Sequence, residues 1–220
     1  MPVFDELYQI ADELRAIASL GLTYEKNGYA VERYQKALQC SARIISALEN
    51  RSPDEILEKY EDTLLQVSPR AGAGGVVQKD GEILLMQRSD DHLWGLPGGL
   101  VETGETLAEA AERELREETG VEGKPIRLLG IFDSRLWRSR VKVHMYHAVF
   151  LFDADESSLD LISHPKETGN GPESETLDVD FFPPDVLPPL SPGHDVRIPF
   201  LLKQLNGEAP VPFCDGLDAL

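Results

Sequence analysis

The sequence predicts an α/β protein that is preceded by a small all-helical domain. Apolar residues recur at helical spacing through the first ~65 residues, whereas glycine- and proline-rich turns separate short apolar runs from residue 69 onward. The chain of 220 residues, 41% hydrophobic and 27% charged, has ordinary globular composition, and its length fits one large domain or one domain plus a small appendage. We therefore expect a helical domain over residues 1–66, an α/β domain over 69–206 and a C-terminal tail over 207–220.

Three helices are expected in the N-terminal domain. Two amphipathic helices should be separated by breaks at Gly21–Tyr24 and at Asn27-Gly28. Ser52 as N-cap, followed by Pro53 and Glu55, indicates a third helix that runs to about residue 65. Three short helices provide little core, so we expect them to pack against another domain or a second subunit.

The α/β domain is expected to begin with a hairpin of residues 72–77 and 83–86 around the Lys79-Asp80-Gly81 turn. A strong helix should start near Thr106, which forms a capping box with Glu109. The expected elements that follow along the chain are strands at 126–133 and 141–152, a polar functional or mobile loop at 153–177, a short strand near 179–182 and a helix near 198–205. The strand at 141–152 is apolar on both faces, which predicts a central position in its sheet.

Charge and cysteine content exclude several classes of protein. Asp and Glu number 39 against 21 Lys and Arg, and the net charge of -18 should repel DNA, RNA and anionic lipid. Cys40 and Cys214 lack the spacing of a disulfide framework or a zinc site. The sequence shows neither a basic leader nor an apolar run of membrane-spanning length. We therefore expect a cytoplasmic protein with no nucleic-acid partner and no membrane association.

Three glutamates suggest a metal site. Glu114, Glu117 and Glu118 stand three and four residues apart on the expected helix, so their carboxylates share one face. A solvated acidic face is the simpler interpretation. However, the preceding Pro97-Gly98-Gly99 turn would let the backbone approach an ion, and grouped carboxylates suit Mg²⁺ or Mn²⁺, which also accept phosphate oxygens.

The same region resembles a known family. Nine residues between positions 99 and 121 match every fixed position of the Nudix hydrolase signature, and their spacing matches too. They are Gly99, Glu105, Arg113-Glu114-Leu115, Glu117-Glu118 and Gly120-Val121. The resemblance implies an α/β/α Nudix sandwich over roughly residues 69–206. It also implies that Glu114, Glu117 and Glu118 bind the metal, with the backbone of Gly98 or Gly99 as a further ligand. Arg113 would orient a glutamate and Glu105 would brace the loop.

The resemblance implies hydrolysis of a P–O–P link by water that metal ions activate. A general base must take the proton of that water. Glu118 could serve, but family members often use a glutamate from the loop before the last strand, here Glu173 or Glu175. We favour Glu175, and an ordinary solvated loop charge is the alternative.

The N-terminal segment is similar to a helical extension found on certain Nudix enzymes that act on ADP-ribose or CDP-choline. Ile17–Tyr24 and Glu32-Arg33-Tyr34 carry this similarity. The similarity implies dimerisation and closure over the substrate, with Tyr24 as a candidate substrate contact. Plain packing of Tyr24 and Tyr34 between helices is the alternative.

A basic block follows the signature. Arg135, Trp137 and Arg138, with Arg140 and Lys142, are candidates for substrate binding, because arginine grips phosphate and an indole stacks on a base. The alternative is a polar hairpin tip. His144 and His147 are separated by an odd number of residues, so they should lie on opposite faces of a strand and not form a metal pair.

Together these features predict a homodimeric, Mg²⁺- (or Mn²⁺-) dependent pyrophosphatase that acts on a nucleoside diphosphate linked to a group X. ADP-ribose, split into AMP and ribose 5-phosphate, is the favoured substrate, and CDP-choline or another CDP-alcohol is the alternative. A Nudix-fold nucleotide-sugar sensor or regulator is the non-enzyme alternative. Intact glutamates and an acidic N-terminal domain argue against that sensor.

Overall fold

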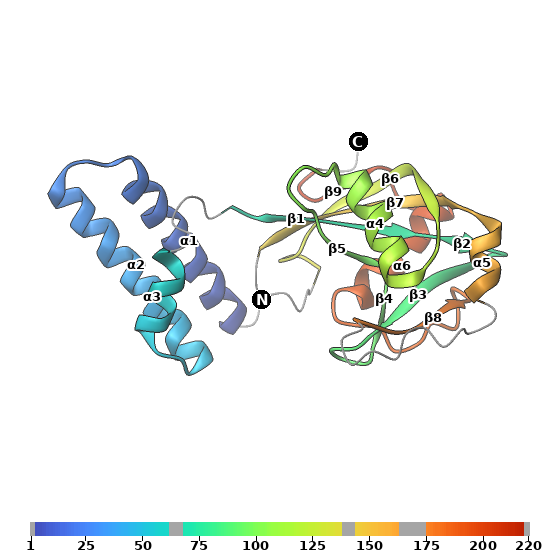
Figure 1. Cartoon of the computed structure of the whole chain (residues 1–220), viewed down its shortest axis with the longest axis horizontal. Coiled ribbons are helices and arrows are strands. Elements are labelled where there is room, and N and C mark those ends of the chain that lie inside the picture. The colour runs from blue at the N-terminus through green and yellow to red at the C-terminus, as the bar shows by residue number, and fades with distance from the viewer. Residues whose placement is uncertain (1–2, 62–67, 138–143, 163–174, 218–220) are drawn as a thin grey trace. The chain divides into compact units, whose positions relative to one another are not determined.

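The computed structural model describes residues 3–61, 68–137, 144–162 and 175–217. The chain divides into two compact units, Met1–Pro69 and Arg70–Leu220, each with its own hydrophobic core (Figure 1). Within the described ranges, no helix is both long enough and apolar enough to cross a membrane.

The N-terminal unit consists of α1 (Val3–Tyr24), α2 (Gly28–Glu49) and α3 (Pro53–Glu61). Its core is a cluster of small and medium side chains from all three helices: Ala18, Leu38, Ala42, Ile56 and Tyr60. The break predicted at Gly21 is absent, and α1 continues through this residue. A Cβ atom on Gly21 would lie 2.5 Å from the ring of Tyr34, so the glycine lets α1 and α2 pack closely. The second predicted break, at Asn27-Gly28, is confirmed, because α2 begins at Gly28 and the Asn27 side chain caps it.

A five-stranded sheet has the order β5-β1-β7-β6-β9. Its strands have the following bounds: β1 Arg70–Val76, β5 Gly98–Leu100, β6 Gly123–Asp133, β7 Met145–Ala154 and β9 Phe213–Cys214. β7 lies between β1, to which it is parallel, and β6, to which it is antiparallel. The central position predicted from its two apolar faces is therefore confirmed.

A second sheet surrounds β3. Its strands have these bounds: β2 Gln78–Lys79, β3 Glu82–Arg88, β4 Trp94–Gly95 and β8 Thr176–Phe182. β3 pairs with each of the other three. The hairpin predicted between residues 72–77 and 83–86 is thus wrong in part, because β1 joins the first sheet and only β2 forms the tight hairpin with β3. Asp80 and Gly81 make that turn with positive φ values of 52° and 85°.

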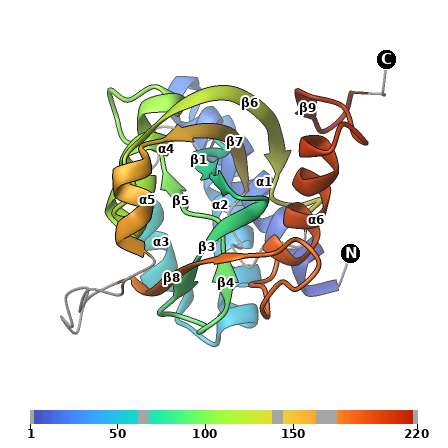
Figure 2. The same cartoon turned by 90° about the vertical axis from the view of Figure 1, so that its right-hand side faces the viewer.

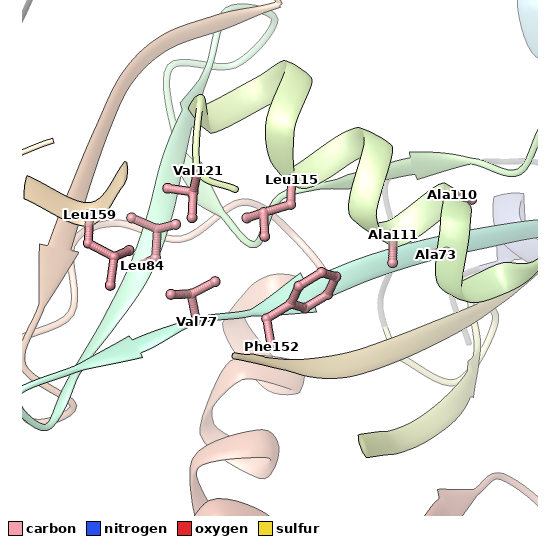
Figure 3. Close-up of a cluster of buried hydrophobic side chains, with 9 residues drawn as sticks. All are labelled: Ala73, Val77, Leu84, Ala110, Ala111, Leu115, Val121, Phe152 and Leu159. Atoms are coloured by element: carbon pink, nitrogen blue, oxygen red, sulfur yellow. The ribbon is translucent and has the colours of Figure 1, made fainter. Parts of the chain in front are cut away.

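Helices cover both sides of the strands. α4 (Leu107–Thr119) and α5 (Glu156–Ile162) contribute to one core cluster, shown in Figure 3, in which Leu115 and Leu159 pack against Val77, Leu84 and Phe152. α6 (His194–Leu205) contributes Ile198 and Leu201 to a second cluster and lies on the opposite side from α5 in Figure 2. The predicted α/β/α sandwich with an N-terminal helical region is confirmed.

Two segments differ from the expectation. α5 lies within the polar stretch that we expected to be a loop. The segment after residue 206, expected as a tail, includes β9, which pairs with β6. Phe213 of β9 packs on Phe132 and Phe200, with ring centroids 5.4 and 4.8 Å apart, so this segment closes one side of the core.

Candidate active site

Helix α4 holds the signature glutamates in a fixed register. The Thr106 hydroxyl accepts the Glu109 N–H, and the Glu109 carboxylate accepts the Thr106 N–H, which is the capping box that the sequence predicts. Gly120 ends the helix in the left-handed conformation with φ 73°. Ala111 and Leu115 are fully buried against the strands, so the helix presents its glutamates along the border of this buried face.

Glu118 is held by the turn before the helix. Its Oε2 accepts the Gly98 N–H at 2.6 Å. Gly98 has φ 156°, and a Cβ there would lie 2.6 Å from the Ala73 carbonyl oxygen, so only glycine lets β5 lie this close to β1. The pKa of Glu118 is raised to about 7, chiefly by burial and also by the charges of Glu114 and Glu175, against the opposite effects of the Gly98 hydrogen bond and the Arg88 charge.

Arg113 lies at the centre of the other carboxylates. Its Nε and Nη2 donate to the two carboxylate oxygens of Glu105 at 2.7 and 3.0 Å, a bidentate pair. Its Nη1 donates to Glu114 at 2.7 Å and to Glu117 at 3.3 Å, and its Nη2 also donates to the Leu100 carbonyl at 3.0 Å. The hydrogen bonds that Glu105 accepts, chiefly those from Arg113, lower the pKa of Glu105 to about 2. One guanidinium therefore connects the loop, the strand and two of the signature glutamates.

Gly99 makes room for Glu114. A Cβ atom on Gly99 would lie 2.4 Å from Oε1 and 2.8 Å from Oε2 of Glu114, so the carboxylate occupies the space that any side chain would need. The glycine pair 98–99 thus lets both Glu114 and Glu118 approach the same strand.

The donor set fits a divalent cation. The carboxylates of Glu114 and Glu118 lie against the backbone of Gly99 and Gly98, and the charges of Glu114 and Glu175 act on Glu118. Mg²⁺ and Mn²⁺ prefer such carboxylate and carbonyl oxygens. Within the described ranges, no group of three or more His, Cys, Asp or Glu side chains is already gathered at metal-binding geometry. A cation would therefore draw Glu114, Glu117 and Glu118 together from their present hydrogen bonds.

The two candidate bases come just before β8 in the sequence. Glu175 is exposed, its carbonyl oxygen accepts the Ser89 N–H at 2.9 Å, and its charge acts on Glu118. The structure thus brings Glu175 to the side of the glutamate cluster. Glu173 lies outside the described residues. The role of either residue as a base stays a prediction.

The basic block has structural partners. The Arg135 Nε donates to both carboxylate oxygens of Asp133, at 3.0 and 3.1 Å. The Trp137 ring packs 5.0 Å from Phe132 between centroids, and its indole N–H donates to Asp215 at 2.7 Å. Arg138 lies outside the described residues. Their part in substrate binding stays a prediction, and the contacts of Trp137 are those of a core residue.

Tyr24 belongs to the N-terminal unit. It ends α1 with 73% of its surface exposed, so its ring is not used for packing within that unit. Its contact with substrate stays a prediction. Tyr34, by contrast, packs on Gly21.

Four polar residues lie near this site without any indication of this in the sequence. Arg88, at the end of β3, pairs with Asp90 at 3.0 Å and affects the pKa of Glu118 through its charge. His147, His194 and Arg197 come from β7 and α6. No local motif connects these residues, because strand register and helix packing bring them together.

Comparison with known proteins identifies both units. The NUDIX domain family matches residues 68–203, and the family described as "UDP-X-like, N-terminal oligomerisation domain" matches residues 5–60. A provisionally named ADP-ribose pyrophosphatase of Bacillus subtilis (strain 168), YjhB, is 33% identical over 185 residues, which cover 84% of each chain. An ADP-ribose pyrophosphatase of Methanocaldococcus jannaschii is 34% identical over 154 residues, 69% of this chain and 82% of that protein.

A solved structure has the same fold. The crystal structure of a UDP-X diphosphatase superposes with a TM-score of 0.57 at 24% identity and covers 96% of this chain and 99% of that one. The family match spans more than half of the chain and contains the whole signature with its intact glutamates. The chain therefore belongs to the Nudix hydrolase family and is a hydrolase of phosphoric anhydride bonds.

Proposed function

We propose that this enzyme hydrolyses nucleoside diphosphates linked to a group X and that ADP-ribose is its main substrate. Water and ADP-ribose would give AMP and ribose 5-phosphate. The observation that carries the choice of substrate is the pair of relatives named for ADP-ribose, at 33% and 34% identity over 84% and 69% of this chain.

A UDP-linked substrate is the second candidate. The family that matches residues 5–60 is described as UDP-X-like. That description concerns the helical unit and not the unit that holds the signature, so it ranks below the relative that covers 84% of this chain.

The residues that would hold Mg²⁺ or Mn²⁺ are Glu114, Glu117 and Glu118, with the backbone of Gly98 as a further ligand. The bound ion supplies charge neutralisation at the diphosphate and a lowered pKa of the attacking water. Arg113 holds Glu114 and Glu117 in place through hydrogen bonds of 2.7 and 3.3 Å. The Gly98 N–H holds Glu118 in the same way at 2.6 Å.

Glu175 is the proposed general base. It is exposed and lies close enough to Glu118 for its charge to raise the pKa of that residue. A carboxylate in this position can accept the proton of a water molecule that attacks phosphorus beside the cation. Glu118 is the alternative base, although its hydrogen bond to Gly98 and its role as a ligand compete with proton transfer.

We further propose that the enzyme is a homodimer in the cytoplasm, joined through α1. Large apolar side chains along this helix are exposed within the N-terminal unit: Val3, Phe4, Ile10, Ile17, Leu20 and Tyr24. Exposed apolar patches of this kind are typical of association surfaces, and the matching family is described as an oligomerisation domain.

A substrate panel tests the proposed function. Purified enzyme with Mg²⁺ would be assayed with ADP-ribose, CDP-choline and UDP-glucose, and the products would be identified by mass spectrometry. We expect the highest kcat/KM for ADP-ribose, with AMP and ribose 5-phosphate as products. A higher kcat/KM for the uridine substrate would transfer the assignment to UDP-X, and no turnover of any nucleoside diphosphate derivative would refute the proposal.

A further inference from the structure

Three nitrogen-rich side chains gather on the face of the five-stranded sheet that is turned away from α4. His147 on β7 is paired in register with Gly72 on β1. The next residue, Ala73, belongs to the core under α4, and Val149, two residues beyond His147, belongs to the core under α6. Because side chains alternate along strands, His147 and Gly72 lie on the α6 side.

Glycines leave the space that the His147 ring occupies. A Cβ atom on Gly72 would lie 2.6 Å from Nδ1, and one on Gly74 would lie 3.1 Å from Nε2. Any side chain at these two positions on β1 would displace the imidazole. The His147 ring therefore lies against β1, the strand whose Gly74 is paired with Gly98 of β5.

His194 and Arg197 join this ring from the first turn of α6. The His194 Nδ1 accepts the Leu96 N–H at 3.1 Å, so the ring proton of the neutral form is on Nε2. The Arg197 Nη2 lies 3.5 Å from Nδ1 and 3.4 Å from Nε2 of the same ring, which places the guanidinium against the imidazole.

The charge of Arg197 has no counter-ion among the residues that the structure describes. No carboxylate of a described residue affects its pKa through charge or a hydrogen bond, and its Nε is buried without a hydrogen-bond partner. Its position in the first turn of α6 adds no compensation, because the helix dipole is positive at that end. Burial lowers the pKa of Arg197 to about 10 and that of His147 to about 3, so Arg197 carries the charge of this group near pH 7.

This group lies within reach of a substrate bound at the glutamates. His194 and Glu118 accept hydrogen bonds of 3.1 and 2.6 Å from Leu96 and Gly98, two residues of one segment. Two residues of extended chain span at most about 7 Å, so the two accepting atoms are at most about 13 Å apart. The charge of Arg88 acts on both His194 and Glu118, so Arg88 lies near both groups.

We propose that His147, His194 and Arg197 form a subsite for a second acidic group of the substrate, a phosphate or carboxylate beyond the diphosphate. The inference rests on the proposed function, because it assumes that the diphosphate lies at the glutamates. Arg197 would supply the charge and the unpaired Nε–H, and His194 would supply its Nε2–H. ADP-ribose itself would bind at the glutamates and leave this subsite empty, whereas a derivative of the same kind with an extra anion on the nucleoside ribose or on X would bind at both places.

Inorganic phosphate is a probe that needs neither metal nor turnover. Imidazole resonances of the metal-free full-length enzyme would be followed by NMR as phosphate is added. We expect saturable shifts of the His147 and His194 signals in the wild type and in Lys203→Gln, which removes an exposed positive charge from the same helix. Arg197→Gln should weaken phosphate binding about ten- to a hundredfold, and Arg197→Lys should restore part of it if the Gln variant folds poorly. The absence of saturable shifts in the wild type, or equal binding by folded Arg197→Gln, would overturn the proposal.

Two matched substrate pairs then locate the extra anion. ADP-ribose is compared with its 2′-phosphate, and UDP-glucose with UDP-glucuronate, through the ratio of kcat/KM within each pair. We expect Arg197→Gln, but not Lys203→Gln, to reduce the preference for the anionic member about ten- to a hundredfold in one pair. The first pair would assign the anion to the nucleoside and the second to X. Unchanged ratios in both pairs would overturn the subsite even if phosphate binds, whereas a wild type inactive on all four compounds would refute the proposed function and leave the NMR result to decide the subsite.

Discussion

Replacement of Gly99 by alanine should greatly reduce the activity of the enzyme and change its stability only slightly. The new Cβ atom would lie 2.4 Å from Oε1 and 2.6 Å from Cδ of Glu114, whereas ordinary contacts begin near 3.4 Å. The Glu114 carboxylate must therefore move by about 1 Å, and misplacement on this scale can reduce a rate about a hundredfold. The backbone itself is not strained, because Gly99 has no positive φ.

The cost in stability should be small. The atoms in the way are the end of a flexible side chain, and the interaction at risk is the 2.7 Å hydrogen bond between Arg113 and Glu114. The loss of one such partly buried bond between charged groups costs about 1.5 kcal/mol. Reduced freedom of the unfolded chain offsets part of this loss, by about 0.4–1 kcal/mol. We therefore expect Tm to fall by no more than about 4 °C.

The assay pairs kcat/KM for ADP-ribose over a range of Mg²⁺ concentrations with thermal unfolding of the metal-free protein. Gly28→Ala is the matched control, because a Cβ there meets nothing within 4 Å. Gly99→Ala should lose about a hundredfold in kcat/KM and need more Mg²⁺, whereas Gly28→Ala should retain its activity. Wild-type activity in Gly99→Ala, or a loss of stability as severe as the loss of activity, would refute this account of Glu114.

Two further predictions concern acid stability and assembly. The pKa of Glu105 is about 2 in the folded protein and near 4.5 when unfolded, so its contribution to stability is complete above pH 4.5 and is lost as the pH falls towards 2. Urea unfolding between pH 6 and 3 should therefore show a shrinking difference between wild type and Glu105→Gln, and a constant difference would contradict the Arg113 pairing. If the proposed dimer forms through α1, Ile17→Lys, at a residue 59% exposed on this helix, should give a monomer in light scattering, whereas Lys36→Gln, at an exposed polar position of α2, should not. A dimeric Ile17→Lys protein would place the interface elsewhere.

The structural features that the sequence predicts correctly are those whose determining residues are close along the chain. The capping box of Thr106 and Glu109 fixes the start of α4, and three- and four-residue spacing fixes the face that carries the glutamates. The two apolar faces of β7 also gave its central position, because burial on both sides leaves a direct pattern in the sequence.

Long-range packing explains the features that were missed. Gly21 taken alone predicts a helix break, yet it lies inside α1. Its missing side chain leaves the space that the Tyr34 ring occupies. Trp137 sits in a basic block, yet Phe132 and Phe213 surround its ring.

The histidine and arginine group could not be predicted for the same reason. His147 reaches the site through the parallel register of β1 and β7, and Arg197 reaches it through the packing of α6 beside Leu96. Neither contact leaves a local pattern, because the partners are many residues apart.

The most direct test of the central claim is the Mg²⁺-dependent hydrolysis rate of Glu118→Gln measured beside Glu112→Gln. Both changes remove one carboxylate from α4, but Glu118 contacts Gly98 within the site, whereas Glu112 pairs with the exposed Lys124. If the glutamate cluster holds the catalytic ion, Glu118→Gln should lose more than about a hundredfold in kcat with its fold intact, and Glu112→Gln should remain near wild type. Equal rates for the two folded variants would contradict the claim that this cluster is the catalytic centre.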